Sequence, residues 1–153
     1  MLRLAVAVLV LVSIGAILTS SGRSSAPVSV RHTCGLTDRQ FISNYQVQLL
    51  AVGMYGDDYL AGSAKAQEVI GAAREAARVV RTSAPIDPSL LLVRQYAPSM
   101  FLEYGRAVKA RAAEKDAGPA MYRSYRIGAH VNDVLQEAQP GLAAAGCDVT
   151  DLF

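Results

Sequence analysis

The chain has no tryptophan and only two histidines and two cysteines among its 153 residues. Two histidines leave few ligands for a zinc ion. No glutamate is followed three residues later by a histidine, so the Glu-x-x-His motif of di-iron helical bundles is absent. Without tryptophan, an aromatic platform for a sugar would depend on tyrosine. We therefore expect no metal site and no cofactor.

The common catalytic signatures are also missing. The chain contains no G-x-S-x-G turn, P-loop, G-x-G-x-x-G or H-E-x-x-H motif. Only one residue separates Ser63 from Lys65, whereas the S-x-x-K motif needs two. Asp57 and Asp58 are neighbours in sequence, and on a helix they would point about 100° apart and miss a common substrate atom. An enzyme is therefore the least favoured class.

The balance of charge shows no bias toward nucleic acid. The full chain carries 15 basic and 13 acidic residues. Removing the segment through Ala26 takes away Arg3 and Arg23, which leaves 13 basic residues against 13 acidic ones. A domain of net charge near zero has no general attraction for nucleic acid, so we expect no nucleic-acid partner.

The longest apolar run lies near the N-terminus, from Leu4 to Leu18, with Arg3 before it and a small polar stretch after it. This is the layout of an export signal. Fifteen helical residues rise roughly 22 Å, short of the about 30 Å hydrocarbon core, which favours a cleaved signal. No clear A-x-A site follows, however, and the residues flanking the run lengthen it enough for a tilted anchor. We interpret residues 1–22 as a signal peptide or signal anchor. The protein is then exported, and either secreted or anchored on the outer side of the cytoplasmic membrane.

The two cysteines agree with export. Cys34 and Cys147 stand at the two ends of the predicted helical region, and in an oxidising compartment they would form one disulfide. A metal pair or a catalytic thiol is the alternative, but neither cysteine belongs to a C-x-x-C motif. Arg31 and His32 stand where a lipoprotein signal has apolar or small residues, so lipid attachment at Cys34 is not expected.

The first helix is expected after a linker at residues 23–36. Thr37 and Gln40 have the spacing of a capping box just before an apolar run. Most of the large side chains that follow recur at helical spacing and should face a core: Phe41, Ile42, Tyr45, Leu49, Val52 and Tyr55.

The second helix is expected from about Ala61 to Arg81, capped by Asp57 or Asp58. One narrow stripe of this segment holds small and β-branched residues: Val69, Ile70, Ala73, Ala77 and Val80. Small residues on a stripe predict close approach of a neighbouring helix.

Prolines divide the rest of the chain. Asp87 and Pro88 are a good N-cap and first-turn pair. Pro98 should either kink the helix that they start or begin another one. A turn is predicted at residues 117–119, and the last helix should end near Pro140.

The predicted fold is therefore all-α. A single bundle of about four helices spans residues 37–147, its ends are tied by the disulfide, and a hydrophobic export or anchor helix precedes it. Residues 148–153 are expected to form a C-terminal tail. No β-alternating run and no internal repeat appears.

The last helix carries a candidate ligand-binding face. At about 100° per residue, Ile127, Val131, Val134, Leu135 and Ala138 form an apolar stripe that should be buried. A second stripe flanks it and holds Tyr122, Arg126, His130, Asp133 and Glu137. Because Arg126 opposes cation binding, and because this spacing also suits a solvated face, we favour the solvated face.

A second candidate is a basic stripe on the second predicted helix, where Arg74, Arg78 and Arg81 follow at spacings of four and three. It could meet an anionic envelope polymer, lipid headgroups or an acidic partner. Glu75 can pair with Arg78, and a solvated face is again the simpler interpretation.

The favoured function is a non-enzymatic extracytoplasmic module that binds an unidentified protein or envelope component, with the membrane as a further contact if the N-terminal segment stays uncleaved. The alternative is a carrier of haem or an apolar molecule in the bundle interior. For haem, one of the seven tyrosines or a histidine would be the ligand, with Met54, Met100 or Met121 nearby.

Overall fold

The computed structural model describes residues 33–152. The chain divides into two units, Met1–Val30 and Arg31–Phe153, and the described residues belong to the second. The predicted signal or anchor segment at 1–22 and most of the predicted linker at 23–36 lie outside the described residues. Within residues 33–152, no helix is long and apolar enough to cross a membrane.

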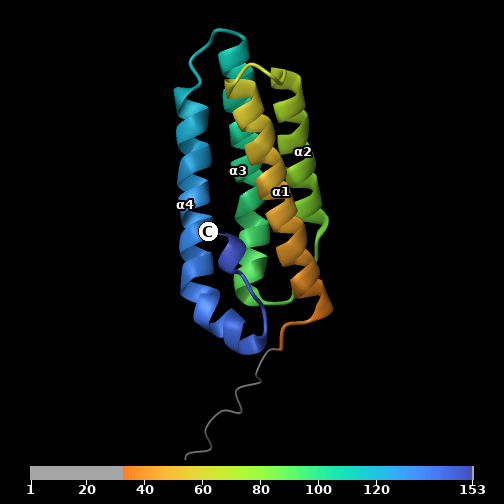
Figure 1. Ribbon diagram of the computed structural model, residues 1–153. Coiled ribbons are helices and arrows are strands. Elements are labelled where there is room, and N and C mark those ends of the chain that lie inside the picture. Colours follow the sequence, from red (N-terminus) through yellow and green to blue (C-terminus); the bar gives the residue numbers. More distant parts are fainter. Residues whose placement is uncertain (1–32, 153) are drawn as a thin grey trace, which may run out of the picture. The chain divides into compact units, whose positions relative to one another are not determined.

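Four α-helices and a short 3-10 helix make up the described unit: α1 (Leu36–Leu60), α2 (Ala66–Thr82), α3 (Pro88–Ala112), α4 (Gly118–Ala145) and η1 (Thr150–Leu152). The helices run alternately up and down, and each packs against the next one in the chain (Figure 1). No strand occurs between residues 33 and 152. The predicted all-α bundle of four helices is therefore confirmed for this part of the chain.

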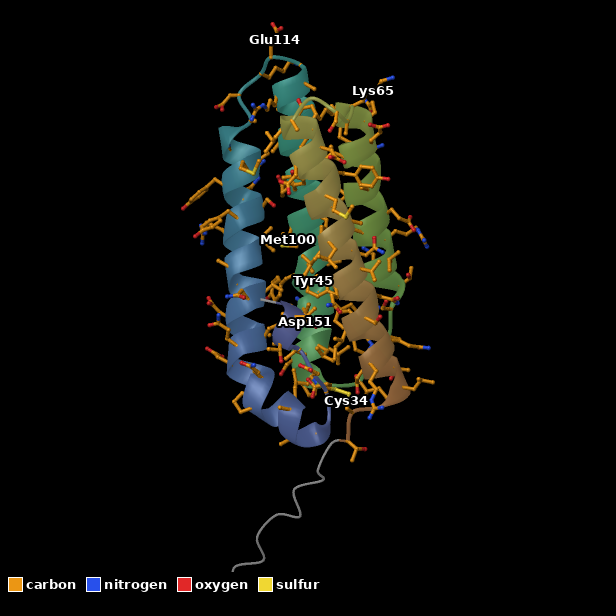
Figure 2. All side chains as sticks on the ribbon, in the orientation of Figure 1. Cys34, Tyr45, Lys65, Met100, Glu114 and Asp151 are labelled. Carbon is orange, nitrogen blue, oxygen red and sulfur yellow. A yellow bond between two sulfur atoms is a disulfide. The ribbon has the colours of Figure 1, made fainter. Side chains whose placement is uncertain are left out.

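Aromatic side chains of α1 and α3 meet in the core. Phe41 and Tyr45 of α1 stack with 6.1 Å between ring centroids, and Tyr45 meets Phe101 of α3 edge to face at 6.2 Å. Tyr45 lies inside the bundle in Figure 2, and burial raises the pKa of its phenol. Tyr55, which was expected in the core, is exposed, and the neighbouring Gly56 is buried instead.

The predicted α2 stripe is buried along its whole length: Val69, Ile70, Ala73, Ala77 and Val80. Its small residues let α3 approach closely. A Cβ atom placed on Gly105 of α3 would lie 3.3 Å from the Cβ of Ala73, so a larger residue at either position would push the helices apart.

The start of α1 differs from the prediction. The helix begins at Leu36, with Gly35 as its N-cap, so Thr37 lies inside it. Asp38 reaches back and accepts a hydrogen bond from the Gly35 N–H at 3.3 Å. The predicted capping box of Thr37 and Gln40 is therefore wrong, because the helix starts two residues earlier than its polar pattern indicates.

The start of α2 also differs. α1 continues through Gly53 and Gly56, so Asp57 and Asp58 belong to its last turns. Neither aspartate therefore caps α2. Lys65 is the N-cap, and its N–H donates to the Glu68 carboxylate at 2.6 Å. A carboxylate in this position satisfies a backbone donor that the helix leaves without a partner.

Neither interior proline ends a helix. α3 continues through Pro98, which is buried, with Ala97 and Phe101 packed in the core on either side. α4 continues past Pro140 and ends at Gly146, whose φ of 86° is the left-handed conformation of a helix C-cap. Of the two alternatives at Pro98, a kink or a new helix, the structure rules out the new helix. The predicted end of the last helix near Pro140 is wrong. Burial of Phe101 and Leu142 beyond the two prolines offsets the backbone hydrogen bond that each removes.

The two ends of the bundle meet at Cys34 and Cys147. Their sulfur atoms lie at bonding distance, with 5.3 Å between the Cα atoms, and both side chains are buried (Figure 2). The Cys34 N–H also donates to the Ala145 carbonyl at 2.9 Å. The predicted cysteine pairing is confirmed in these positions.

The segment after Cys147 is packed. Val149 and Leu152 are buried in the core, and the Asp151 carboxylate accepts a hydrogen bond from the Gln46 side chain of α1 at 3.4 Å. Residues 148–152 therefore help to cover the space between α1 and α4.

Candidate functional site

The candidate face of α4 points into solvent. Tyr122, Arg126, His130, Asp133 and Glu137 are all exposed. Of the apolar stripe beside them, Val131 and Leu135 are buried and the other three residues are half-buried. The inner apolar stripe and the outer polar stripe of α4 are therefore those predicted from the helical spacing of about 100° per residue.

Two aromatic contacts organise the upper part of this face. The ring of His130 meets the ring of Tyr96 on α3 nearly at right angles, with 4.7 Å between centroids. The Arg126 guanidinium lies 5.9 Å from the centroid of the Tyr122 ring, within the range of a cation–π contact. Together with Arg123 and Ile127, these residues line a shallow groove of about 380 Å³ between α3 and α4.

The acidic residues of the same stripe do not take part in this groove. Asp133 and Glu137 are absent from its lining. Within residues 33–152, no three His, Cys, Asp or Glu side chains gather as metal ligands would. The groove is cationic and aromatic, which suits an anion or an aromatic ring rather than a metal ion.

A buried carboxylate holds the same helices together. Glu103 of α3 is only 8% exposed and pairs with Arg106 of its own helix. It also accepts a hydrogen bond from the Arg123 Nε of α4 at 3.0 Å. Two partners satisfy a charge that would be costly to bury alone, so this cluster has a structural role.

The predicted basic stripe of α2 separates into two parts. Arg74, Arg78 and Arg81 are all exposed. Arg78, however, pairs with Glu75, and its hydrogen bond lowers the pKa of that carboxyl. Arg78 also lines a groove on the α1 side of α2, together with Thr37 and Asn44.

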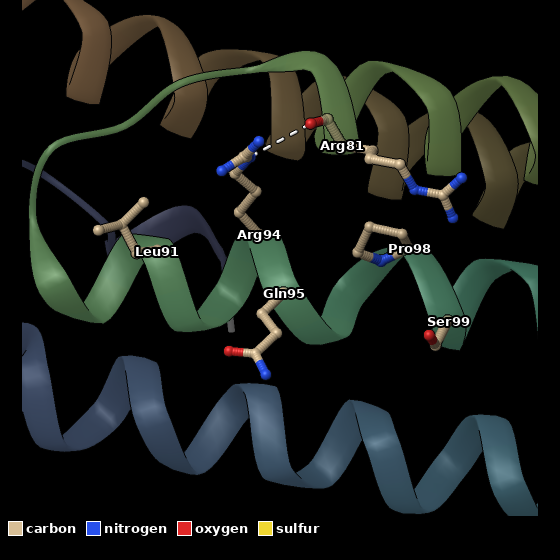
Figure 3. Close-up of a pocket in the computed structure, with 6 residues that line it drawn as sticks. All are labelled: Arg81, Leu91, Arg94, Gln95, Pro98 and Ser99. Carbon is tan, nitrogen blue, oxygen red and sulfur yellow. Dashed lines mark hydrogen bonds between the residues drawn. The ribbon is translucent and has the colours of Figure 1, made fainter.

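Arg74 and Arg81 turn toward α3 and meet further cations there. Arg81 lines a hollow of about 440 Å³ with Arg94, Gln95 and Ser99 (Figure 3). Arg74 lines a second hollow, of about 300 Å³, with Arg106 and Lys109. The two hollows follow one another along the same pair of helices, and we call them together the α2–α3 groove: Arg74, Arg81, Arg94, Gln95, Ser99, Arg106 and Lys109, over a floor of Leu91, Pro98, Leu102 and Gly105.

The charge of the α2–α3 groove has one sign. No acidic side chain lines either hollow. Of its five cations, only Arg106 takes part in an ion pair among residues 33–152. The Nε of Arg94 donates to the Arg81 carbonyl at 3.2 Å, which holds the arginine beside the end of α2 (Figure 3). A groove of this kind attracts anions.

Helical spacing within α2 indicated only part of this groove. Three of its cations belong to α3: Arg94, Arg106 and Lys109. They lie near Arg74 and Arg81 only because α2 packs against α3. A signal was nevertheless available in α3, because Leu91, Pro98, Leu102 and Lys109 recur on one helical face.

Aromatic rings fill the core between α1 and α3, where Phe41, Tyr45 and Phe101 contact one another. Met54 and Met121 are exposed on different helices, and only Met100 is packed against the core. The hollows described above lie on the surface between helices.

Comparison of the chain with models of protein families, with curated proteins and with solved structures finds no match. We therefore infer the function from the chemistry of the surface of residues 33–152.

Proposed function

We propose that this protein is a non-enzymatic binding module of the cell envelope, exported by its N-terminal segment, that holds an extended anionic polymer in the α2–α3 groove. The observation that carries the proposal is the set of cations that two helices contribute to one groove without an acidic side chain in its lining. A disulfide-bonded pair of cysteines supports an oxidising, extracytoplasmic compartment.

The arrangement of the cations favours a polymer over a single small anion. From Arg94 to Lys109 the α3 helix rises roughly 22 Å, so the charges are distributed along the groove. Each charge lies at or near the surface, where one contact contributes little, and binding strength would come from several contacts in a row. Because the cations lie in a recess between two helices, a narrow chain reaches them more readily than a flat bilayer does.

The polar and apolar lining also suits a polymer. Gln95 and Ser99 offer neutral hydrogen-bonding groups between the two cationic ends. Leu91 and Leu102 provide a short apolar floor beside them. Repeating phosphate or carboxylate groups could meet the cations while the polymer backbone lies over this floor.

The test uses the full chain in a nonionic detergent and fluorescently labelled inorganic polyphosphate as the probe. Binding followed by anisotropy should weaken steeply as salt is added, because surface charges are screened. The variant R74Q/R81Q should raise the dissociation constant by about tenfold or more.

The matched control is R111Q/K115Q, which removes the same two charges from exposed positions outside the α2–α3 groove. It should change the dissociation constant by less than about threefold. Equal losses of affinity in the two variants would show that polyphosphate is attracted by net charge alone. That result would overturn the proposal that the α2–α3 groove is the binding site. Binding to vesicles of anionic lipid without binding to polyphosphate would replace the polymer with a membrane surface.

A further inference from the structure

The outward face of α1 is unusual because it is exposed and uncharged over most of its length. No charged residue occurs between Arg39 and Asp57. Val47, Leu50 and Met54 are 55%, 61% and 67% exposed, so these three large side chains contribute little to the core of their own chain. They lie on the side of α1 opposite the buried Tyr45 and Val52.

The exposed positions on this face follow a regular pattern. Eight residues alternate at spacings of four and three, and all eight are exposed: Leu36, Gln40, Ser43, Val47, Leu50, Met54, Asp57 and Ala61. This is the spacing of the a and d positions of a coiled coil, which place side chains along one seam toward a partner helix. We call these eight residues the α1 seam.

We propose that the α1 seam is the contact between two copies of this chain, paired through antiparallel α1 helices about a two-fold axis. In such a pair, residues whose numbers add to 97 face one another. Val47 then meets Leu50 of the second copy, and the small Ser43 leaves room for Met54. Gln40 can donate to the Asp57 carboxylate, and Ala61 faces Leu36. Each contact occurs twice because the interface is isologous.

The charges at the two ends of the seam support a second copy as the occupant. Arg39 and Asp57 lie on the same flank of α1, because eighteen residues turn the helix through five complete turns. In the antiparallel register, Arg39 lies one residue, about 1.5 Å along the axis, from the level of Asp57 of the second copy, close enough for the two side chains to pair. The pairing is repeated at the other end. The uncharged middle of the seam is thus closed at each end by a pair of opposite charges.

These two charges cannot pair within one chain. Eighteen residues of helix separate Arg39 from Asp57 by roughly 27 Å. Neither residue takes part in an ion pair among residues 33–152. If a charge change at Arg39 compensates a charge change at Asp57, the two side chains must therefore belong to different copies of the chain.

The α1 seam and the α2–α3 groove lie on different sides of the bundle. Figure 3 shows six residues of the groove on α2 and α3, with α1 running behind α2. Pairing through α1 leaves the groove open in both copies. The dimer therefore does not depend on the proposed function, and the two can fail separately.

The test measures the mass of the full chain against concentration, by sedimentation equilibrium in a density-matched nonionic detergent. We expect a monomer–dimer equilibrium. Arg39→Glu and Asp57→Arg should each raise the dissociation constant by about tenfold, because each places two like-charged pairs in the dimer. The double variant R39E/D57R should return it to within about threefold of the wild type. Leu50→Lys, next to the axis, should raise it by more than about a hundredfold.

Glu137→Arg is the control, since it makes an equal change of charge at an exposed position on α4. It should leave the dissociation constant within about threefold. Thermal melting of each variant separates loss of pairing from loss of folding. A wild-type chain that stays monomeric at every concentration would overturn the proposal. So would a double variant in which the two single losses add, because only facing charges rescue one another.

Discussion

The hydroxyl of Tyr104 on α3 lies against the backbone of Gly56 on α1. A Cβ atom placed on this glycine would be 2.3 Å from the Tyr104 Oη. α1 and α3 approach one another at few places, because α1 packs mainly against α2 while α3 packs against both α2 and α4. The absence of a side chain at this position therefore allows α1 and α3 to approach.

We predict that Gly56→Ala lowers the free energy of unfolding by about 1–3 kcal/mol, because the methyl group must displace the tyrosine ring or the helix. Urea unfolding measures the change. In the background Tyr104→Phe, which lacks the clashing oxygen, the loss should be smaller. Gly53→Ala is the control, since nothing lies within 4 Å of its Cβ position. It should stabilise the helix by up to about 1 kcal/mol. Equal effects of the two alanines would argue against the contact.

Asp38 should be among the most sensitive polar positions. Its carboxylate is fully buried and accepts hydrogen bonds from the N–H groups of Ile86 at 2.7 Å, Asp87 at 3.0 Å and Gly35. We predict that Asp38→Ala costs about 3 kcal/mol or more, because three backbone donors lose a charged acceptor. Asp38→Asn should cost less. The comparison is Asp87→Ala, which removes an ordinary N-cap and should cost about 1 kcal/mol in the same urea titration. If Asp38→Ala lowers the free energy of unfolding by no more than Asp87→Ala does, the Asp38 carboxylate is not a major acceptor in the core.

We predict that the free energy of unfolding falls in alkali because the Tyr45 phenol is buried. Burial raises the pKa of its phenol above the ordinary value of about 10. The unfolded chain therefore releases this proton first, and the stability that Tyr45 contributes is complete below about pH 10 and declines as the pH rises above it. For one such group the slope is about 1.4 kcal/mol per pH unit.

The measurement is urea unfolding of the wild type and Tyr45→Phe between pH 8 and 11.5. The phenylalanine variant should show a shallower decline above pH 10. Tyr104 adds to the decline in both proteins, because burial and the Asp57 charge raise the pKa of its phenol as well. Parallel curves for the two proteins would contradict the assignment to Tyr45.

Exported protein should contain no reactive thiol. Cys34 and Cys147 are buried at bonding distance, and titration of the unreduced, denatured protein should find less than one thiol per chain. Replacing both cysteines with alanine should lower the free energy of unfolding by about 2–5 kcal/mol, because the unfolded chain is no longer closed into a loop. Two titratable thiols in protein taken from its own host would contradict the disulfide.

Export makes a separate prediction about the N-terminus. If residues 1–22 are a cleaved signal, the mature chain should begin between about Gly22 and Val30. Mass spectrometry of protein from its own host measures this directly. An intact N-terminus in the membrane fraction would indicate the anchor instead.

The local pattern of the sequence was sufficient for the four helices, the cysteine pair and the buried α2 stripe. The helices and the α2 stripe depend on periodicity within a single segment, and the pairing follows because the chain has only two cysteines. It was not sufficient for the ends of the helices. Gly35 and Lys65 cap α1 and α2 although neither is a strong N-cap residue, because Asp38 and Glu68 inside the first turns supply the acceptors.

The candidate sites divide in the same way. The wheel separated the two stripes of α4 correctly, since both are properties of one helix. A helical wheel could not bring Tyr96 to His130 or Arg94 to Arg81, because each contact joins two helices: Tyr96 and His130 meet where α3 packs against α4, and Arg94 and Arg81 where α3 packs against α2.

Hydrophobic spacing along single segments of the chain is thus enough to specify the set of helices and the inner faces of α2 and α4. Three features appear only in the packed bundle: α3 and α4 continue through their prolines, Gly56 and not Tyr55 faces the core, and cations of α2 and α3 share a groove. These outcomes depend on side chains from distant segments, whose burial and charge act only after the helices have packed.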